Sequence, residues 1–542
     1  MGMGGPAGGG NVIEGNYIGV AGDGRSALPN DGVGVYVEIS LQSNYIASNV
    51  ISANTYGGIS FYQATNNIVQ GNYIGLAADG ATPAPNGGAG IYLFESQSNL
   101  LGGVAPGQGN VVSANLDDGI QLYGPGTSYN TVEGNLVGTT KTGLSRLGNL
   151  FSALSLIAGP TNNTIGGASA AARNIFSGSS NYDGVYLDGA SNNVVQGNYI
   201  GTDASGLIAL TNGEYGLTLF GASQSNLILG NVIAASANYG VLISDPGTSG
   251  NIFQGNDVGV GADGATPLGN AWQGIILENG AATNIIGLAL DGSGAGNIIA
   301  DNGYEGVILY NTNTIGNCLR GNSIYGNGAI GINLVGGSEN GYGVTANHVG
   351  GSVPGPNDLQ NYPVLTVAAV FTNSMVIAGT INSGPGRNIL IDIYRNPAPD
   401  PSGYGQGQIY VGSTIAQTDT QGNGSFSMPL AARLAGQFFT ATATDAATGD
   451  TSEFSLDLQA ANVSGTGPGE LTNPSYSSSN GFSFGITLAT NQYYTIQLTT
   501  NLAASPVMWA DLTNFLATNP SVRILDGTAT NSPASFYRIV TP

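Results

Sequence analysis

Short runs in which aliphatic and polar residues alternate fill the chain up to about residue 360, and each run is broken by Gly or Asn. Residues 193–202 show the pattern most clearly, with the sequence Asn-Val-Val-Gln-Gly-Asn-Tyr-Ile-Gly-Thr. Alternation with a period of two is typical of a β-strand that buries one face, and β-branched residues favour strands. No stretch carries an apolar stripe at helical spacing that is long enough to predict an α-helix instead. The pattern therefore predicts short β-strands joined by turns.

The Gly-Asn centre of this pattern returns six times, at intervals of 56 to 66 residues. The copies are Gly15-Asn16, Gly71-Asn72, Gly134-Asn135, Gly197-Asn198, Gly255-Asn256 and Gly321-Asn322. Between them lies a second phrase, Asn-aliphatic-aliphatic-small-small-Asn, and a third, Gly-aliphatic-x-aliphatic, occurs about twice per interval. Such periodicity predicts a solenoid with two coils per repeat. An Asn amide bonds adjacent backbone and tolerates left-handed conformations, so we expect these six Asn to form a structural ladder.

These phrases resemble the right-handed parallel β-helix of the pectate-lyase-like superfamily. In particular, they are similar to the repeats of large secreted bacterial surface proteins, and residues 355–365, Gly-Pro-Asn-Asp-Leu-Gln-Asn-Tyr-Pro-Val-Leu, resemble the exit sequence of that group. The resemblance implies the fold for about two thirds of the chain. It does not decide the function, because the same fold carries lyases, hydrolases, epimerases, adhesins and inert scaffolds.

The predicted fold class is all-β, with a right-handed parallel β-helix over residues 1–358. The periodicity then ends, and strand-length alternation over residues 359–462 predicts an immunoglobulin-like β-sandwich. Its expected strands are Met375–Ile381, Ile389–Tyr394, Ile409–Ser413, Gly424–Met428, Phe438–Thr444 and Glu453–Leu458. A Gly- and Pro-rich linker is expected at 463–474 and a small C-terminal β module at 475–542.

Composition and charge narrow the setting of this fold. The 542 residues include 89 Gly, 41% hydrophobic residues and only 8% charged residues, which fits a turn-rich all-β protein and argues against disorder. The formal net charge of −22 argues against nucleic acid and anionic membrane surfaces as partners. The single cysteine, Cys318, excludes an intramolecular disulfide and occupies an aliphatic position, so we expect a buried, inert thiol.

The start of the chain predicts neither a signal peptide nor a complete helix end. Residues 1–10 are Gly-rich without an apolar core, and the repeat is entered in mid-phrase at Asn11. We therefore expect a truncated chain whose export signal lies upstream, and an extracellular or cell-surface location. No run is long and apolar enough to predict a membrane span.

The catalytic motifs of well-known members of the superfamily are missing. Polygalacturonase-like members combine three Asp with a His-Gly and an Arg-x-Lys, whereas here the single His348 precedes Val349 and the single Lys141 lacks the Arg. Pectate-lyase-like members need an acidic calcium site and an Arg base, but the arginines of the helix are scattered. The epimerase-type Asp-Pro-His-Glu sequence is also absent.

One column of residues, just before each Gly-aliphatic strand, combines aromatic rings and carboxylates. Its members are Tyr56, Asp117, Asp118, Tyr182, Asp183, Glu214, Tyr215, Tyr239, Trp272, Tyr304 and Glu305. In a β-helix these sites stack along one edge. Three interpretations remain open: solvated turn residues, a binding stripe for a neutral glycan, or a glycosidase carboxylate pair one or two coils apart. A second column, Glu14, Gln70, Glu133, Gln196, Gln254 and Arg320, is expected to face solvent.

Long turns of the form Asp-Gly-x-x-x-x-x-Asn begin at Asp23, Asp79 and Asp263, and Asp203 begins a related version. Each is either a calcium ligand, since hard cations prefer clustered oxygens, or a plain turn. Only one carboxylate per loop is present, and no other cofactor is expected.

Together these features predict a secreted or cell-surface structural or adhesive protein that binds neutral glycans along the aromatic and acidic edge. The alternative is a polysaccharide-degrading glycoside hydrolase, or less readily a lyase, on the same fold. A polysaccharide or extracellular matrix is the expected partner, and self-association through exposed sheet edges is a further possibility.

Overall fold

The computed structural model describes residues 2–3, 8–39, 42–351, 353–371, 374–462, 472–477, 481–488, 493–500, 507–519, 521–526 and 536–540. The chain divides into two compact units. Unit 1 comprises Met1–Val364, Thr380–Phe426 and Thr440–Asp457, and unit 2 comprises Leu365–Gly379, Ser427–Phe439 and Leu458–Pro542. The domain boundaries expected from the sequence stay predictions, and most of the expected linker lies outside the described residues.

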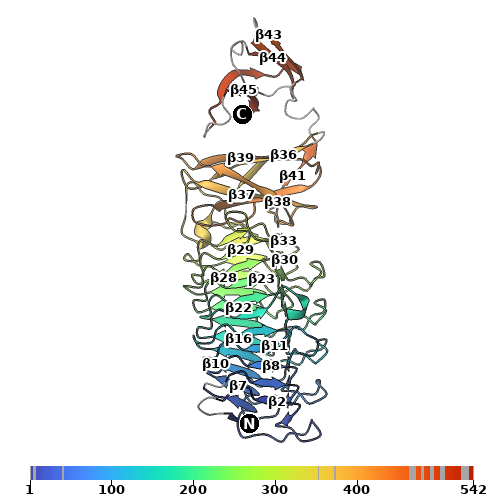
Figure 1. Ribbon diagram of the computed structural model, residues 1–542. Helices are drawn as coiled ribbons and strands as arrows, with labels where there is room; N and C mark the ends of the chain where they lie inside the picture. The colour runs from blue at the N-terminus through green and yellow to red at the C-terminus, as the bar shows by residue number, and fades with distance from the viewer. Residues whose placement is uncertain are drawn as a thin grey trace. The chain divides into compact units, whose positions relative to one another are not determined.

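Three long parallel sheets form a right-handed β-helix, and the chain visits each sheet once per coil (Figure 1). Sheet 1 has twelve strands: β1 (Gly2–Met3), β4 (Val35–Val37), β7 (Ile59–Tyr62), β10 (Ile91–Phe94), β13 (Ile120–Tyr123), β16 (Leu154–Ile157), β19 (Val185–Asp188), β22 (Leu217–Phe220), β25 (Val241–Ser244), β28 (Ile275–Glu278), β31 (Val307–Leu309) and β34 (Ile332–Leu334).

Sheets 2 and 3 each have eleven strands and complete the coils. Sheet 2 contains β2 (Val12–Glu14), β5 (Tyr45–Ala47), β8 (Ile68–Gln70), β11 (Leu100–Gly102), β14 (Thr131–Glu133), β17 (Thr164–Gly166), β20 (Val194–Gln196), β23 (Leu227–Leu229), β26 (Ile252–Gln254), β29 (Ile285–Gly287) and β32 (Cys318–Arg320). Sheet 3 contains β3 (Tyr17–Ile18), β6 (Val50–Ile51), β9 (Tyr73–Ile74), β12 (Val111–Val112), β15 (Leu136–Val137), β18 (Ile175–Phe176), β21 (Tyr199–Ile200), β24 (Val232–Ile233), β27 (Asp257–Val258), β30 (Ile298–Ala300) and β33 (Ser323–Tyr325).

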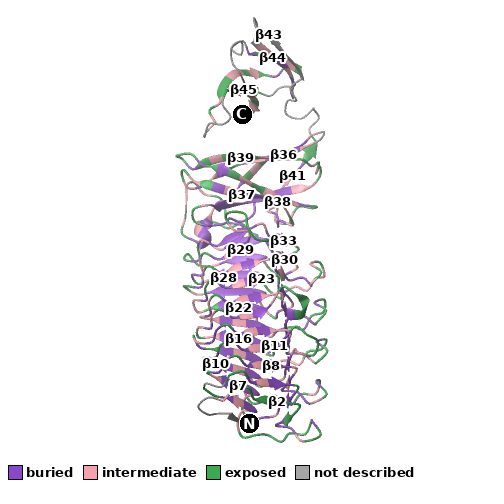
Figure 2. Cartoon of the chain, in the orientation of Figure 1, coloured by how far each residue is buried: buried purple, intermediate pink, exposed green. Residues whose placement is uncertain are grey.

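The core of the β-helix is a column of aliphatic side chains from all three sheets. Buried residues accordingly run along the strands of the helix (Figure 2). In strand β10, Ile91 and Leu93 are fully buried, whereas Tyr92 between them points outward and is half-buried. Parallel pairing in register places Ile91 against Ile59 in one neighbouring strand and Ile120 in the other. Each coil thus buries its apolar face against its neighbours, as expected for a solenoid.

The predicted Asn ladder is confirmed, and its hydrogen bonds link one coil to the next. Asn198 Oδ1 accepts hydrogen bonds from the main-chain N and the side-chain Nδ2 of Asn174, and Asn198 Nδ2 donates to Asn231 Oδ1. The first Asn of the second sequence phrase, such as Asn110, occupies a rung of the same ladder between the Gly-Asn copies, whereas the second Asn, such as Asn115, belongs to a parallel ladder. Gly197, which precedes Asn198, has a φ of +69°, a left-handed conformation in which glycine carries little strain.

The last coil is covered by polar side chains from later in unit 1. Glu453 accepts hydrogen bonds from the main-chain N of Leu334 and of Thr345. Asn357 continues one Asn ladder by accepting from the main-chain N of Asn317. The expected strand Glu453–Leu458 is wrong, because residues 453–457 form no extended strand and the Glu453 side chain instead accepts hydrogen bonds from the backbone of the helix end.

Arg320 corrects the expectation that the column of Glu14 and its equivalents faces solvent throughout. Its guanidinium is buried and bonds both carboxylate oxygens of Asp392, with Nη2–Oδ1 at 2.8 Å and Nε–Oδ2 at 2.9 Å. Gln70 in the same column is also buried and donates to the main-chain oxygen of Gly102. Cys318 is buried as expected, and burial raises the pKa of its thiol to about 12.

Four smaller sheets follow the β-helix, and no α-helix occurs in the described part of the chain. Two have four strands: β39 (Asn423–Leu430), β36 (Met375–Asn382), β35 (Val364–Val370) and β42 (Ala461–Asn462) in one, and β38 (Ile409–Gln417), β37 (Asn388–Asn396), β40 (Phe438–Asp445) and β41 (Leu458–Gln459) in the other. Two have three strands: β43 (Thr472–Ser477), β44 (Gly481–Thr487) and β47 (Ser521–Asp526), then β46 (Ala510–Leu516), β45 (Tyr493–Thr499) and β48 (Phe536–Val540). The two short 3₁₀ helices are η1 (Ala170–Ala172) and η2 (Pro356–Leu359).

These sheets establish the expected β structure after the helix, while the immunoglobulin-like assignment stays a prediction. None of the helices in the described ranges is both long and apolar enough to cross a bilayer.

Candidate functional site

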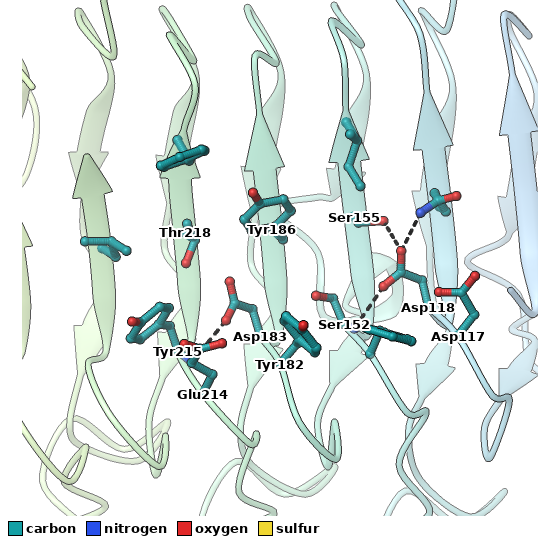
Figure 3. A pocket seen from close by; sticks show the side chains of 15 residues that line it. Asp117, Asp118, Ser152, Ser155, Tyr182, Asp183, Tyr186, Glu214, Tyr215 and Thr218 are labelled. Atoms are coloured by element: carbon teal, nitrogen blue, oxygen red, sulfur yellow. Dashed lines mark hydrogen bonds between the residues drawn. The ribbon is translucent and has the colours of Figure 1, made fainter. Parts of the chain in front are cut away.

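A groove of about 450 Å³ lies on the outer face of sheet 1, over strands β13 to β25 (Figure 3). Its lining residues are Asp117, Asp118, Gln121, Phe151, Ser152, Ser155, Ile157, Tyr182, Asp183, Tyr186, Glu214, Tyr215, Thr218, Phe220 and Leu242. Four of them carry a carboxyl group and five carry an aromatic ring. Among the described residues that line the groove there is no lysine, arginine or histidine. The groove is therefore acidic and aromatic.

Strand register explains why these side chains meet. Ile120, Leu154 and Val185, the first residues of β13, β16 and β19, are aligned in parallel pairing. Asp118 and Asp183 each lie two residues before such a position, so they occupy equivalent sites on two coils separated by one intervening coil. Neighbouring strands are about 4.8 Å apart, which places the two main chains about 9.6 Å apart.

The carboxyl group of Asp118 is held by three hydrogen bonds. Its Oδ1 accepts from the main-chain N of Ser152 at 2.9 Å, and its Oδ2 accepts from Ser155 Oγ and Gln121 Nε2, each at 2.6 Å. The residue is only 4% exposed. Burial raises the pKa of Asp118 to about 6, although the three donors act in the opposite direction. The nearby Asp117 carboxylate contributes to the increase in this pKa.

Asp183 is buried to the same degree but has fewer donors. It is 3% exposed, and its Oδ1 accepts a hydrogen bond from the main-chain N of Tyr215 at 3.1 Å. Burial raises the pKa of Asp183 to about 7. The Thr218 hydroxyl and the Tyr215 N–H lower this pKa, whereas the Glu214 and Asp118 carboxylates raise it further. A carboxylic acid in this environment keeps its proton close to neutral pH.

The floor of the groove is formed by polar side chains from the middle of the strands. Ser155, Tyr186 and Thr218 are neighbours in register on β16, β19 and β22. Burial raises the pKa of the Tyr186 phenol to about 12, with Asp188 and Asp183 contributing, so this group remains a hydrogen-bond donor. The buried Thr218 hydroxyl faces Asp183 (Figure 3) and forms no hydrogen bond of regular geometry within the described structure.

Aromatic side chains line the edge of sheet 1 where its strands begin. The rings of Phe151 and Tyr182 lie 4.9 Å apart, and Tyr182 is 44% exposed. Farther along the helix, Tyr215 and Tyr239 stack at 5.1 Å with an interplanar angle of 1°. Trp272 stacks on Tyr304 at 5.3 Å. The rings thus continue beyond the groove along the same edge.

The structure brings six of the eleven expected edge residues together in the groove, namely Asp117, Asp118, Tyr182, Asp183, Glu214 and Tyr215. Tyr239, Trp272 and Tyr304 extend the edge beyond it, and Tyr56 is exposed in an earlier coil. Glu305 instead accepts hydrogen bonds from Gln273 and Asn333. The interpretation as solvated turn residues is wrong for Asp118 and Asp183, because neighbouring coils bury both.

Several groove residues were not expected from the sequence. Phe151 and Ser152 occupy the edge position on the coil between Asp118 and Asp183. They were missed because Ala153 stands where the other coils have the Gly that marks the strand. Tyr186 lies in the middle of its strand and faces outward. Aligning the strands in register would have placed it beside Ser155 and so in the groove.

A second hollow of about 230 Å³ adjoins the groove towards the start of the helix. Small residues such as Gly57, Ser60 and Ala89 line it, together with Tyr92. Asp117 and Gln121 line both spaces, so the two form one continuous depression along the outer face of sheet 1.

The four Asp expected at possible calcium loops lie apart from the groove and close their own turns. Asp263 Oδ1 accepts hydrogen bonds from the main-chain N of Ala265 and Thr266, and its Oδ2 accepts from Thr266 Oγ1. Asp23 and Asp79 make equivalent bonds. Asp203 bonds Ser205 and the main-chain N of Ile208. Calcium binding at these loops stays a prediction.

Three solved structures are similar to parts of this chain at low identity. The A-module of mannuronan C-5 epimerase AlgE4 from Azotobacter vinelandii is 17% identical over 63% of this chain and 91% of that one, with a TM-score of 0.31. A mutant of the periplasmic alginate epimerase AlgG is 13% identical over 56% and 73% of the two chains, with a TM-score of 0.26. DFA-IIIase from Arthrobacter chlorophenolicus is 16% identical over 53% and 66%, with a TM-score of 0.23. No curated protein sequence matches this chain.

The family described as "Periplasmic copper-binding protein (NosD)" matches residues 10–167 and 161–297. Copper sites in proteins are built from His, Cys and Met, and residues 10–297 contain none of these three types. Among the described residues, no three His, Cys, Asp or Glu side chains cluster as metal ligands. The residues present therefore do not fit a copper site. Because the two matches cover more than half of the sequence, the chain nevertheless belongs to the NosD family.

Proposed function

We propose that the protein binds a neutral polysaccharide along the outer face of sheet 1, with the groove over β13 to β25 as the principal contact. The observation that carries this proposal is the groove itself, where exposed rings stand beside buried carboxyl groups in a hollow of about 450 Å³. A concave site with aromatic walls and a few converging polar groups is the usual form of a ligand site.

The residues that line the groove suit both the apolar faces and the hydroxyl groups of a sugar ring. Exposed rings such as Tyr182 offer flat apolar surfaces for the C–H faces of a sugar. Asp117 and Glu214 offer carboxylate oxygens that accept hydrogen bonds from hydroxyl groups. The acidic lining and the net charge of −22 disfavour a polyuronate, which supports a neutral ligand.

The length of the aromatic edge favours a polymer over a single sugar. Coils repeat at about 4.8 Å, close to the length of one hexose in an extended polysaccharide. A chain laid parallel to the helix axis would contact the groove and then the stacked pair Trp272 and Tyr304. The adjoining hollow beyond Asp117 would receive its other end.

We place this binding function outside the cytoplasm, because the family is described as periplasmic. Adhesion to extracellular matrix would use the same groove, whereas self-association through sheet edges is a separate prediction. Hydrolysis of the bound polysaccharide is the second candidate function. It is favoured by the presence of two buried carboxyl groups, Asp118 and Asp183, in one groove.

A glycan array probed with the purified chain tests the proposal. We expect binding to neutral polysaccharides, with little binding to polyuronates. Array binding that is unchanged in a Tyr182→Ala, Tyr215→Ala double variant would place the ligand elsewhere, and the absence of binding to every glycan would contradict the proposal.

A further inference from the structure

We propose that Asp183 and Asp118 are the acid and base pair of an inverting glycoside hydrolase, with the scissile bond held over strand β16 between them. This inference rests on the proposed binding of a glycan in the groove. It adds the reaction, the two residue roles and the stereochemical outcome.

The placement of the two carboxyl groups is the first argument. Asp118 and Asp183 lie at equivalent positions before β13 and β19, with the coil of β16 between them. Two strand spacings place the main chains of the two residues about 9.6 Å apart, close to the upper end of the separation of about 6.5–9.5 Å at which inverting glycosidases hold their carboxyl groups so that a water molecule fits beside the sugar. Retaining enzymes need only about 5–5.5 Å.

The space between the carboxyl groups is the second argument. The intervening coil contributes Ser152 and Ser155, whose small side chains leave room above β16 (Figure 3). Phe151 and Tyr182 form a ring pair beside that space. A sugar that packs on Tyr182 would therefore lie with its glycosidic bond between the two acids.

The hydrogen bonds assign the roles. Asp118 accepts three hydrogen bonds, and donors of this kind stabilise the anion that a general base requires. Asp183 is buried to the same degree but accepts only one hydrogen bond of regular geometry, which favours the protonated form that a general acid requires. Burial raises both pKa values, to about 6 for Asp118 and about 7 for Asp183, in the order that these roles demand.

The other ionisable groups around the pair support the same order. Glu214 and Asp118 face Asp183, and their negative charges help it to retain its proton. Asp117 is the charged neighbour of Asp118. Tyr186 remains a neutral phenol, because burial raises its pKa to about 12.

The reaction balances with water as the sole co-reactant. The Asp183 carboxyl proton passes to the glycosidic oxygen as its bond to the anomeric carbon breaks. Water attacks the opposite face of that carbon and forms the new C–O bond, while its proton passes to the Asp118 carboxylate. Transfer of one proton from Asp118 back to Asp183 through solvent restores the enzyme.

The test uses the full chain and a panel of cellohexaose, xylohexaose, mannohexaose and laminarihexaose. Binding is measured by calorimetry with the Asp183→Asn variant, and product release is measured with the unaltered chain by chromatography. We expect hexaose cleavage, with kcat/KM reduced at least ~100-fold in Asp183→Asn and in Asp118→Asn. Asp188→Asn, at the end of strand β19 that follows Asp183 and outside the groove lining, is the matched control and should keep its activity.

Two further readouts separate chemistry from structure. A dinitrophenyl glycoside of the cleaved sugar needs no acid, so Asp183→Asn should cleave it at nearly the unaltered rate while Asp118→Asn should not. Proton NMR during hydrolysis should show that the first-formed anomer is inverted. The pH profile of kcat/KM should rise near pH 6 as Asp118 ionises and fall near pH 7 as Asp183 loses its proton.

The outcomes distinguish the two proposals. A hexaose that binds but is never cleaved would overturn the hydrolase assignment and leave glycan binding intact. Retention of configuration would overturn the role of Asp118, since an adjacent carboxylate such as Glu214 would then be the nucleophile. Absence of binding by the whole panel and by the glycan array would contradict the proposed function, and with it this inference.

Discussion

Replacing Asn198 by Ala tests whether the Asn ladder holds neighbouring coils together. The Asn198 side chain is fully buried, and Ala removes its amide without adding a clash. The substitution takes the acceptor from two donors of Asn174, the main-chain N at 3.2 Å and Nδ2 at 2.9 Å. It also removes the donor to the main-chain oxygen of Ile165 and to Asn231 Oδ1.

The structure allows the magnitude to be worked out. A buried donor left without a partner costs about 1–3 kcal/mol. The main-chain N–H of Asn174 loses its acceptor entirely, whereas Asn174 Nδ2 keeps a hydrogen bond to the main-chain oxygen of Val132. We therefore expect the free energy of unfolding to fall by about 3 kcal/mol.

Urea unfolding followed by far-ultraviolet circular dichroism measures the global loss, and hydrogen exchange of the peptide around Asn174 measures the local one. Asn16→Ala is the matched control, because Asn16 is exposed at the first rung and its side-chain oxygen accepts no hydrogen bond from the described residues. We expect this control to cost less than about 1 kcal/mol. Equal losses in the two variants, or unchanged exchange at Asn174, would refute the reasoning.

Other perturbations test the burial and charge of particular groups. Asp183→Asn should raise the free energy of unfolding by on the order of 3 kcal/mol at pH 8 and change it little at pH 4, as measured by urea titration at both values. The sign follows because the pKa of Asp183 is raised to about 7 in the folded chain, so stability is lost as pH rises from about 4 to 7. Arg320→Met should destabilise the chain by about 3–5 kcal/mol by leaving the Asp392 carboxylate buried and unpaired, and a second change, Asp392→Leu, should restore most of the loss. Asp263→Ala should lower the melting temperature slightly by removing the acceptor that closes its turn, which thermal unfolding at fixed pH would detect.

Much of the β-helix could be predicted because the same residue types recur at equivalent positions of every coil. The Gly-Asn phrase marks a turn in which the glycine adopts a left-handed conformation and the Asn forms a rung of the ladder. Few other residue types can fill either position. The strand Glu453–Leu458 could not be predicted correctly from alternation. Its Glu453 side chain accepts hydrogen bonds from the main-chain N of Leu334 and Thr345, a role that depends on residues more than one hundred positions earlier.

The groove could be predicted only in part. The column that contains Asp118 and Asp183 followed from the repeat, but both residues precede their strands, where the alternation of strand residues assigns no face. Their burial depends on how adjacent coils stack against them: Ser152 and Ser155 of the next coil contact Asp118, and the main-chain N of Tyr215 on the following coil contacts Asp183. The raised pKa values of the two acids follow from that burial, so they could not be read from the sequence.

The central claim is that a glycan lies along the outer face of sheet 1 and contacts Tyr182. Calorimetric titration of the best array ligand into the unaltered chain, Tyr182→Ala and Tyr17→Ala tests it most directly. Tyr17 is similarly exposed but belongs to sheet 3, so its variant controls for the general loss of an aromatic side chain. We expect the affinity to fall about tenfold in Tyr182→Ala and to remain unchanged in Tyr17→Ala. Equal affinities for all three proteins would contradict the account.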